Sequence, residues 1–283
     1  MGYPSPSSAR SFNELARTVQ HLVKRESETR RLIRAERAAH FADAQALAEL
    51  RTELVPTDLP DVPGIDITAW HEPASDGNDV LGDFYDVFPS GDKRWNIVLG
   101  DVCGHGAAAA KRTALVRYSL RTALMHHLDP GDALAEVDTI VRNDRQDPGR
   151  FATVTYLSID MTRPGTIIRA NAGHPPPLLR EPDGSTRWLT DANATPIGIK
   201  SAAQYGTAVV DLQPGSVILL YTDGAIDARS SNGERFGQER LERLMATAPA
   251  GNAKSIVAHI ADGILAHAER NLIDDIALLV LRR

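Results

Sequence analysis

The spacing of hydrophobic and polar positions divides the chain into a helical N-terminal part and a longer part of alternating strands and helices. Residues 13–54 contain no Pro or Gly and are rich in Ala, Leu, Glu and Arg, which favour helix. Written as heptads, seven of its twelve seam positions are apolar, and the polar ones lie in the middle. We therefore predict a long helix over 13–55 with a weak coiled-coil pattern, preceded by a disordered tail at 1–12.

This helix has two interpretations. It lies solvated against its own domain, or it pairs with a second copy of the chain and transmits a signal. We expect the second, and hence a homodimer formed through the helix. Prolines at positions 56, 60 and 63 end the helix, because they lack backbone donors and bias the residues before them to extended conformations. We place a domain boundary there, with one domain over 56–283.

Beyond residue 63 the pattern predicts strands alternating with helices. Alternating or continuously apolar runs predict strands within 65–74, 83–90, 95–102, 151–160, 166–180, 217–224 and 274–283. Helical spacing predicts helices at 110–127, from about 131 to 141, at 238–247 and at 253–269. Strands joined by tight turns, with helices in pairs, indicate a layered α+β domain with largely antiparallel sheets.

Composition narrows the class of protein. The 283 residues are 42% hydrophobic and 24% charged, which is typical of a globular protein. No apolar run approaches the roughly 20 residues of a membrane helix, and the N-terminus lacks an apolar signal core, so we expect a cytoplasmic protein that does not bind a membrane. The net charge of −6 disfavours nucleic acid as a partner. The single cysteine, Cys103, excludes an intrachain disulfide and a cysteine zinc cluster, so any metal must be held by oxygen or histidine.

Acidic residues recur beside glycines or at strand ends. They are Asp83 and Asp86 in "LGDFYD", Asp101 in "LGDVCGHG", Asp223 in "LLYTDG", and Asp274 and Asp275 in "LIDDIALLVL". Each alone has an ordinary explanation as a turn, a cap or an ion-pair partner. Gathered together, ionised carboxylates at buried strand ends would repel one another unless a cation lay between them. As a set they therefore predict an all-oxygen site for Mg²⁺ or Mn²⁺.

Five motifs then carry a resemblance to a known family. In chain order they are "GDFYDVF", "GDVCGHG", "NAGHPPPLL", "LLYTDGAIDAR" and "DDIALLVLR". Their order and approximate spacing resemble the SpoIIE/RsbU-type branch of the metal-dependent protein phosphatases, the PPM family, over about residues 50–283. The resemblance implies a four-layer αββα sandwich, in which two antiparallel sheets are flanked by helix pairs, following the long N-terminal helix.

The resemblance also implies a site with two Mg²⁺ or Mn²⁺ ions. Asp101 resembles the carboxylate that bridges both ions, and the main-chain carbonyl of Val102 resembles a further ligand. Asp83 resembles the ligand of the first motif, while Asp223 and Asp274 resemble those at the C-terminal strands. Asp275 is the alternative to Asp274. Asp83, Asp101 and Asp223 would be the catalytic carboxylates, because they would hold the ions that activate water. The activated water would then attack the phosphoester directly, so no Cys or Ser nucleophile is needed.

Other residues of these motifs keep two interpretations each. His105 and His174 either donate a proton to the leaving oxygen or hold their loops by hydrogen bonds, and we favour the second. Cys103 either packs as a small residue or makes activity sensitive to oxidation, and we favour packing. Gly104 and Gly106 allow a tight turn from strand to helix, although a phosphate-binding loop is an alternative.

The function that the resemblance implies is a protein serine/threonine phosphatase. In this branch the usual substrates are phosphorylated STAS-type anti-anti-sigma proteins of partner-switching pathways. One alternative is a catalytically weak phosphatase-like scaffold that acts by binding. Another is a two-metal hydrolase of nucleotides or DNA, which the acidic composition of the chain disfavours.

Overall fold

The computed structural model describes Arg31 and residues 54–56, 58–74, 82–104, 106–126, 129–144, 151–163, 165–199 and 203–283. The chain divides into two units, Met1–Glu49 and Leu50–Arg283. The fold described below belongs to the second unit. The predicted tail at 1–12 and nearly all of the predicted helix over 13–55 lie outside the described residues. They stay predictions, as does the domain boundary after residue 55.

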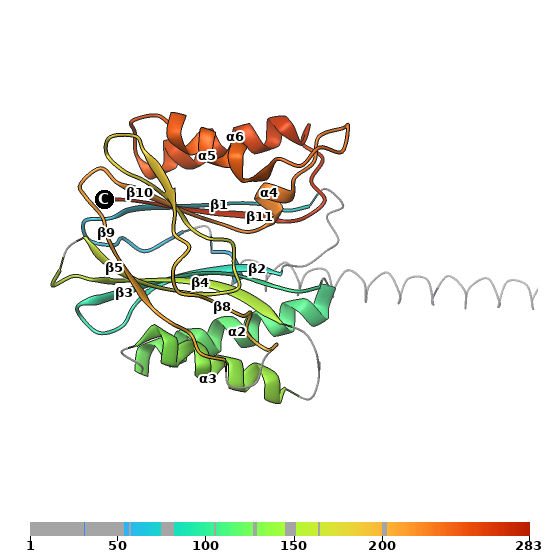
Figure 1. The fold of residues 1–283 in the computed structure, drawn as a ribbon. Helices are drawn as coiled ribbons and strands as arrows, with labels where there is room; N and C mark the ends of the chain where they lie inside the picture. Colours follow the sequence, from blue (N-terminus) through green and yellow to red (C-terminus); the bar gives the residue numbers. More distant parts are fainter. Residues whose placement is uncertain are drawn as a thin grey trace, which may run out of the picture. The chain divides into compact units, whose positions relative to one another are not determined.

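One layer of the second unit is a five-stranded sheet in which every neighbouring pair is antiparallel (Figure 1). Its strands, in spatial order, are β1 (Asp66–Glu72), β11 (Ile276–Arg282), β10 (Val217–Tyr221), β6 (Leu178–Arg180) and β7 (Thr186–Trp188). The first and last strands in sequence are therefore neighbours. The C-terminal strand β11 lies between β1 and β10 and is buried along most of its length.

The facing layer is a six-stranded sheet (Figure 1). Its strands are β2 (Asp83–Pro89), β3 (Arg94–Val102), β4 (Ala152–Asp160), β5 (Thr166–Ala172) and β8 (Asn193–Ala194), with β9 (Ala208–Asp211) also paired to β5. All pairs are antiparallel except the short pair β5–β8. The prediction of largely antiparallel sheets is confirmed.

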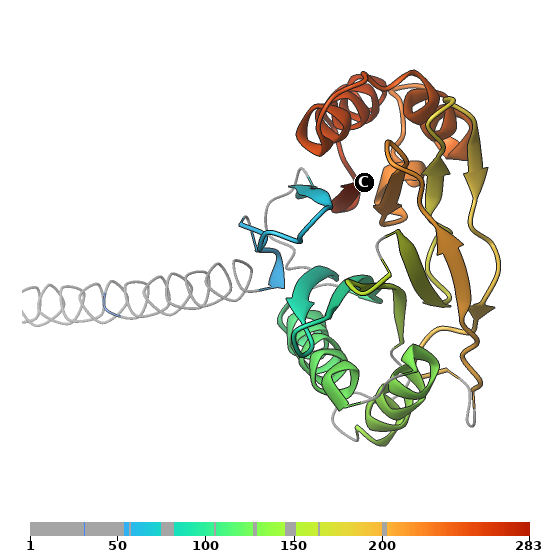
Figure 2. The same ribbon diagram turned by 90° about the vertical axis from the view of Figure 1, so that its left-hand side faces the viewer.

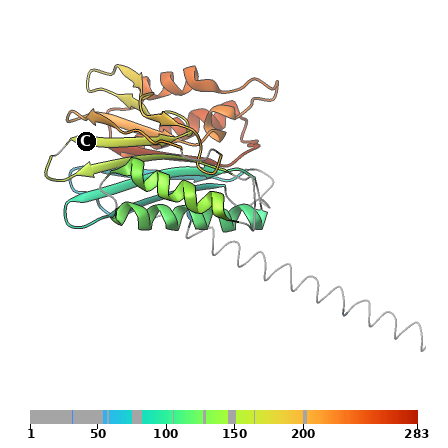
Figure 3. The ribbon, with the colours of Figure 1, turned by 60° about the horizontal axis from the view of Figure 1, so that its bottom comes forward.

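Helices cover the outer face of each sheet (Figures 2 and 3). On the six-stranded sheet they are α2 (Gly106–His126) and α3 (Pro130–Asn143), and on the five-stranded sheet α5 (Gly237–Thr247) and α6 (Ala253–His267), with short α4 (Gly224–Asp227) leading into α5. Asp129 begins α3 by accepting a hydrogen bond from the Gly131 amide at 2.7 Å. The four-layer αββα sandwich inferred from the motifs is confirmed.

Alternating residues of the central strands enter two hydrophobic cores. Leu220 and Leu279 belong to the core that includes the space between the sheets, whereas their neighbours Leu219 and Leu278 belong to the core beneath α5 and α6. All four side chains are fully buried. A near-continuous apolar strand is therefore explained by burial on both of its faces, and removal of this apolar surface from water stabilises the sandwich.

The structure also contains elements that the hydrophobic pattern does not predict. Strands β7, β8 and β9 and helix α4 are two to four residues long, too short to show a period. Helix α2 starts at Gly106, four residues before the predicted start, because a run of four alanines has no polar face to mark its beginning. In the part of the chain that the structure describes, none of the helices is both long and apolar enough to cross a membrane.

Candidate metal centre

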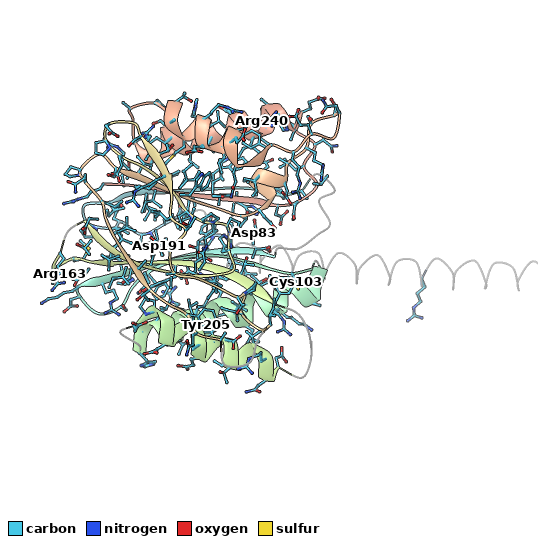
Figure 4. All side chains as sticks on the ribbon, in the orientation of Figure 1. Asp83, Cys103, Arg163, Asp191, Tyr205 and Arg240 are labelled. Carbon is cyan, nitrogen blue, oxygen red and sulfur yellow. The ribbon has the colours of Figure 1, made fainter. Side chains whose placement is uncertain are left out.

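All of the predicted acidic residues except Asp86 come together at one end of the sandwich, whereas Asp86 pairs with arginines of α2. Asp83 is the first residue of β2 and Asp101 the second-last of β3, and the antiparallel register places them directly opposite each other. Asp223 follows the end of β10, and Asp274 precedes the start of β11. Because β10 and β11 are also antiparallel neighbours, these two lie at the same end of their sheet. Figure 4 shows Asp83 between the two sheets.

Asp83, Asp101, Asp223, Asp274 and Asp275 form a carboxylate cluster that includes residues of both sheets. Burial and the neighbouring charge of Asp101 raise the pKa of Asp83 well above its ordinary value, and Asp275 and Asp274 of the opposite sheet add to this. Burial, followed by the charges of Asp223 and Asp274, raises the pKa of Asp101 to about 7. Carboxylates that are far apart in the sequence thus lie close enough in the fold to repel one another.

The carboxylate cluster is closed on one side and open to solvent on the other. Asp83 and Asp275 are buried, Asp101 is half-buried, and Asp223 and Asp274 are exposed. Partial burial and the charge of Asp274 raise the pKa of Asp223, and partial burial and Asp275 raise that of Asp274. A cation or a phosphorylated side chain would therefore reach the cluster from the side of Asp223 and Asp274.

Two glycines allow the acidic segments to approach closely. A Cβ atom at Gly82 would lie 2.5 Å from Asp101 Oδ1 and 2.6 Å from the Val102 carbonyl oxygen. A Cβ at Gly224 would collide with the Asp275 carbonyl oxygen. The glycine of the Asp223-Gly224 pair therefore serves this close approach, and no left-handed turn is involved, because Asp223 adopts a helical backbone at the start of α4.

The donor set fits a hard divalent cation. Within the described part of the chain, no three His, Cys, Asp or Glu side chains are already arranged closely enough to hold a metal ion. The available donors are nonetheless carboxylates and a main-chain carbonyl, two of which converge on the space that Gly82 leaves open. Repulsion among the carboxylates raises several of their pKa values, and a bound Mg²⁺ or Mn²⁺ would relieve that repulsion. The ligand roles of Asp83, Asp101, Val102, Asp223 and Asp274 stay predictions.

The two adjacent aspartates before β11 have different surroundings. Asp275 is buried, and its Oδ1 accepts a hydrogen bond from the Ala74 amide at 2.7 Å, so it holds the end of the segment that follows β1. Asp274 is exposed, and its Oδ1 accepts from the Asp275 amide at 2.9 Å. This difference favours Asp274, the residue chosen from the motif, as the one that faces a ligand.

Sequence reasoning missed Thr222. Its hydroxyl donates a hydrogen bond to Asp83 Oδ2 at 2.8 Å and accepts one from the Ala277 amide at 2.9 Å. Thr222 therefore orients the Asp83 carboxylate from the opposite sheet. Its only sequence signal is its place between an apolar strand and the Asp-Gly pair.

The remaining motif residues have structural surroundings. His174 is buried, and its ring lies between Thr153 Oγ1 and the Tyr221 carbonyl. Burial lowers the pKa of His174 to about 3, so the ring is neutral at physiological pH, which supports the structural interpretation of this residue. Gly104 adopts a left-handed φ of 103°, which favours glycine at the turn after β3. His105 lies outside the described residues.

Cys103 sits at the end of β3, near the start of α2 (Figure 4). Its Sγ accepts a hydrogen bond from the Phe151 amide at 3.4 Å, and its own amide donates to the Phe151 carbonyl. These contacts join the strand ends of β3 and β4 and agree with a packing role. Sensitivity to oxidation stays untested.

Comparison with known proteins identifies the family. Residues 91–283 match the family described as Stage II sporulation protein E (SpoIIE). The chain is 27% identical to phosphoserine phosphatase RsbU of Bacillus subtilis, over 86% of this chain and 70% of RsbU. It is 28% identical to protein IcfG of Synechocystis, over 83% of this chain and 40% of IcfG. The chain thus spans less than half the length of IcfG.

Solved structures give the same result for the fold. The RsbU and RsbW domains of Rv1364c from Mycobacterium tuberculosis align with a TM-score of 0.69 at 30% identity, over 81% of this chain and 62% of that one. The SiaA-PP2C domain of Pseudomonas aeruginosa aligns with a TM-score of 0.71 at 23% identity, over 88% of this chain and 98% of that one. The protein therefore belongs to the SpoIIE family, in the SpoIIE/RsbU branch of the metal-dependent protein phosphatases.

Proposed function

We propose that the protein is a metal-dependent protein serine/threonine phosphatase that hydrolyses phosphoserine and phosphothreonine with two Mn²⁺ or Mg²⁺ ions. The observation that carries this proposal is the carboxylate cluster, in which residues of four separate segments meet at one end of a PPM-type sandwich. The names of RsbU and of RsbP, a second Bacillus subtilis relative at 30% identity, describe phosphoserine phosphatases, which supports the same activity.

The chain's own residues have definable tasks in this reaction. Asp101 and the Val102 carbonyl, with Asp83, Asp223 and Asp274, would hold the ions. When bound, the ions activate water and neutralise charge on the phosphoryl group. Thr222 keeps Asp83 turned toward the cluster through a hydroxyl that donates to Oδ2. The exposed carboxylates Asp223 and Asp274 mark the side from which a phosphorylated segment of another protein enters.

The substrate and the setting belong to the same proposal. We infer a phosphorylated STAS-type anti-anti-sigma protein as substrate, in a partner-switching pathway of the cytoplasm. The RsbU, RsbP and Rv1364c resemblances support this class. The N-terminal segment over 13–55 would form the homodimer that connects the enzyme to its signal.

Metal-dependent release of phosphate tests the enzyme proposal. Purified protein, stripped of metal, is mixed with p-nitrophenyl phosphate and with a phosphorylated STAS protein, with and without millimolar Mn²⁺ or Mg²⁺. We expect turnover of both substrates only with added metal. Absence of turnover at every metal concentration would favour the phosphatase-like scaffold, which acts by binding alone.

Asp101→Asn tests the predicted bridging carboxylate, because the change would remove the negative charge with which Asp101 would hold the ions. We expect nearly all turnover to be lost. Asp183→Asn is the matched control, since Asp183 is an exposed turn residue that bonds only Ser185 among the described contacts. Activity of Asp101→Asn within about tenfold of wild type, or about 1.4 kcal/mol in barrier height, would contradict the bridging role.

A further inference from the structure

Two polar links join the facing sheets at the end that carries the carboxylate cluster. The first is Thr222, which follows β10 of the five-stranded sheet and donates to Asp83 of the six-stranded sheet. The second is the imidazole of His174. Its Nδ1 lies 2.9 Å from Thr153 Oγ1 on β4, and its Nε2 lies 3.1 Å from the carbonyl oxygen of Tyr221 on β10. Elsewhere, the space between the sheets is filled mainly by apolar side chains.

His174 is held rigidly in this position. The Asn171 side chain bonds the His174 backbone twice, accepting from its amide at 2.8 Å and donating to its carbonyl at 2.9 Å. His174 and Asn171 are both buried. The ring therefore has little freedom to turn, and both of its nitrogens are used in joining the sheets.

The partners of the ring determine its tautomer. A carbonyl oxygen only accepts, so Nε2 must carry the proton that bonds Tyr221. The imidazole is neutral, because burial lowers the pKa of His174 to about 3. Nδ1 then accepts, and the single hydroxyl proton of Thr153 goes to it at 2.9 Å rather than to the Asp101 carbonyl at 3.4 Å. The three groups form a link with a defined direction: Thr153 to His174 to Tyr221.

Both ends of this link are next to predicted metal ligands. Thr153 is the register partner of Asp101 in the β3–β4 pair. Tyr221 stands two residues before Asp223 in the chain. A change in the length of the link would therefore move the backbone that carries Asp101 relative to the backbone that carries Asp223.

We propose that His174 is a positioning residue, whose neutral ring sets the spacing of the two sheets at the carboxylate cluster and thereby the affinity for the metal ions. The proposal rests on the proposed function, because it concerns the same ions. It differs from a general role in stability, since the ring joins the segments that carry the ligands on opposite sheets. A merely structural His174 network would lower stability and leave metal affinity unchanged.

Removal of the Thr153 hydroxyl tests the link without introducing a cavity. Thr153→Val keeps the shape of the side chain, Thr153→Ser keeps the hydroxyl, and Thr166→Val makes the same change at a half-buried hydroxyl on β5 that bonds Asp211. Mn²⁺ affinity of the full chain is measured by calorimetry. We expect Thr153→Val to bind Mn²⁺ about tenfold more weakly, which corresponds to the loss of one partly buried hydrogen bond, and the other two variants to match wild type.

Nitrogen NMR of the wild-type ring gives a second readout that needs no variant. We expect a neutral His174 protonated on Nε2 from pH 8 to pH 5, with or without Mn²⁺. A ring protonated on Nδ1, or a charged ring at pH 6, would overturn the proposed link. The same spectrum of Thr153→Val should show a shifted Nδ1 resonance, because that nitrogen loses its donor.

The outcomes separate this proposal from the proposed function. If wild type binds Mn²⁺ and Thr153→Val binds it equally well, the positioning role is wrong and the phosphatase proposal stands. If Thr153→Val binds more weakly and Thr153→Ser does not, the positioning role is supported. If wild type binds neither Mn²⁺ nor Mg²⁺, both proposals are wrong.

Discussion

At the scale of the residue, the carboxylate cluster is defined by groups that destabilise one another. Asp101 loses hydration and faces the charges of Asp223 and Asp274, so its pKa rises to about 7. Protonation of Asp101 at pH 5 would relieve its repulsion with the neighbouring carboxylates, and a divalent cation bound at pH 7.5 would relieve the same repulsion. Protons and metal ions are therefore expected to compete for Asp101.

This competition predicts a pH dependence of stability in the metal-free protein. The raised pKa of Asp101 means that the folded state binds a proton more tightly than the unfolded state does, so this contribution to stability is present below about pH 4 and is lost as the pH rises to about 7. His174 acts in the opposite sense, because its pKa is lowered to about 3. The comparison must therefore isolate Asp101.

We expect Asp101→Asn to stabilise the metal-free protein at pH 7.5 by more than it does at pH 5, as measured by thermal unfolding at both pH values. Asp183→Asn, which lies away from the carboxylate cluster, provides the baseline. Equal effects of Asp101→Asn at the two pH values would show that the Asp101 carboxyl titrates normally.

Gly82→Ala is predicted to block metal binding through one added methyl group. The new Cβ would occupy the space between Asp101 Oδ1 and the Val102 carbonyl oxygen. Gly206→Ala is the matched control, because nothing lies within 4 Å of a Cβ built there. We expect Mn²⁺ binding, followed by calorimetry, to be lost only in Gly82→Ala. Normal Mn²⁺ binding by that variant would place the ions elsewhere.

At the scale of the element, strand β2 faces two different partners. Asp83 and Asp86 are three residues apart, so the two-residue period of a strand directs them to opposite faces. Asp83 faces the opposite sheet, whereas Asp86 pairs with two arginines of α2, Arg117 at 3.3 Å and Arg121 at 3.0 Å. Asp86, which belongs to the same motif as Asp83, therefore anchors a helix and takes no part in the carboxylate cluster.

Asp86→Asn should destabilise the protein by about 3 kcal/mol, because it leaves the buried guanidinium of Arg117 without a counter-charge. Arg121→Ala should cost less than about 1 kcal/mol, since the Arg121 side chain is 42% exposed and its ion pair is screened by water. Urea unfolding of both variants measures the difference. An equal cost for the two changes would contradict the assignment of the buried pair.

At the scale of the whole molecule, all described carboxylates of the cluster belong to the unit Leu50–Arg283. Leu54 and Val55, near the end of the predicted N-terminal helix, are buried in the core of this unit. Deletion of residues 1–50 would keep both of them. Removal of residues 1–50 should therefore abolish the proposed dimerisation and leave the folded phosphatase domain with its carboxylate cluster intact.

We expect the chain without residues 1–50 to be a monomer by light scattering and to retain metal-dependent turnover. Full-length protein measured at the same concentration is the control and should be a dimer. If the truncated and full-length chains had the same oligomeric state and the same dependence of turnover on metal concentration, the N-terminal segment would neither assemble nor regulate the enzyme.

The sequence alone was sufficient for the fold class and for naming acidic residues that the structure brings together. Alternating and continuous apolar runs marked the long strands, because burial on one or both faces leaves a clear period. The five motifs contain Asp83, Asp101, Asp223 and Asp274, which the structure places at one end of the sandwich. Short elements such as β8, with two residues, were missed because they depend on partners far away in the chain.

Only the tertiary structure decided which of these groups meet and which serve other purposes. The register opposes Asp83 to Asp101, and the antiparallel pair β10–β11 adds Asp223 and Asp274. It also brings Thr222 to Asp83 across 139 residues, and joins His174 to both sheets. Local sequence carries no information about such pairs, because they arise from the order of strands and the stacking of sheets, which the packing of the whole core determines.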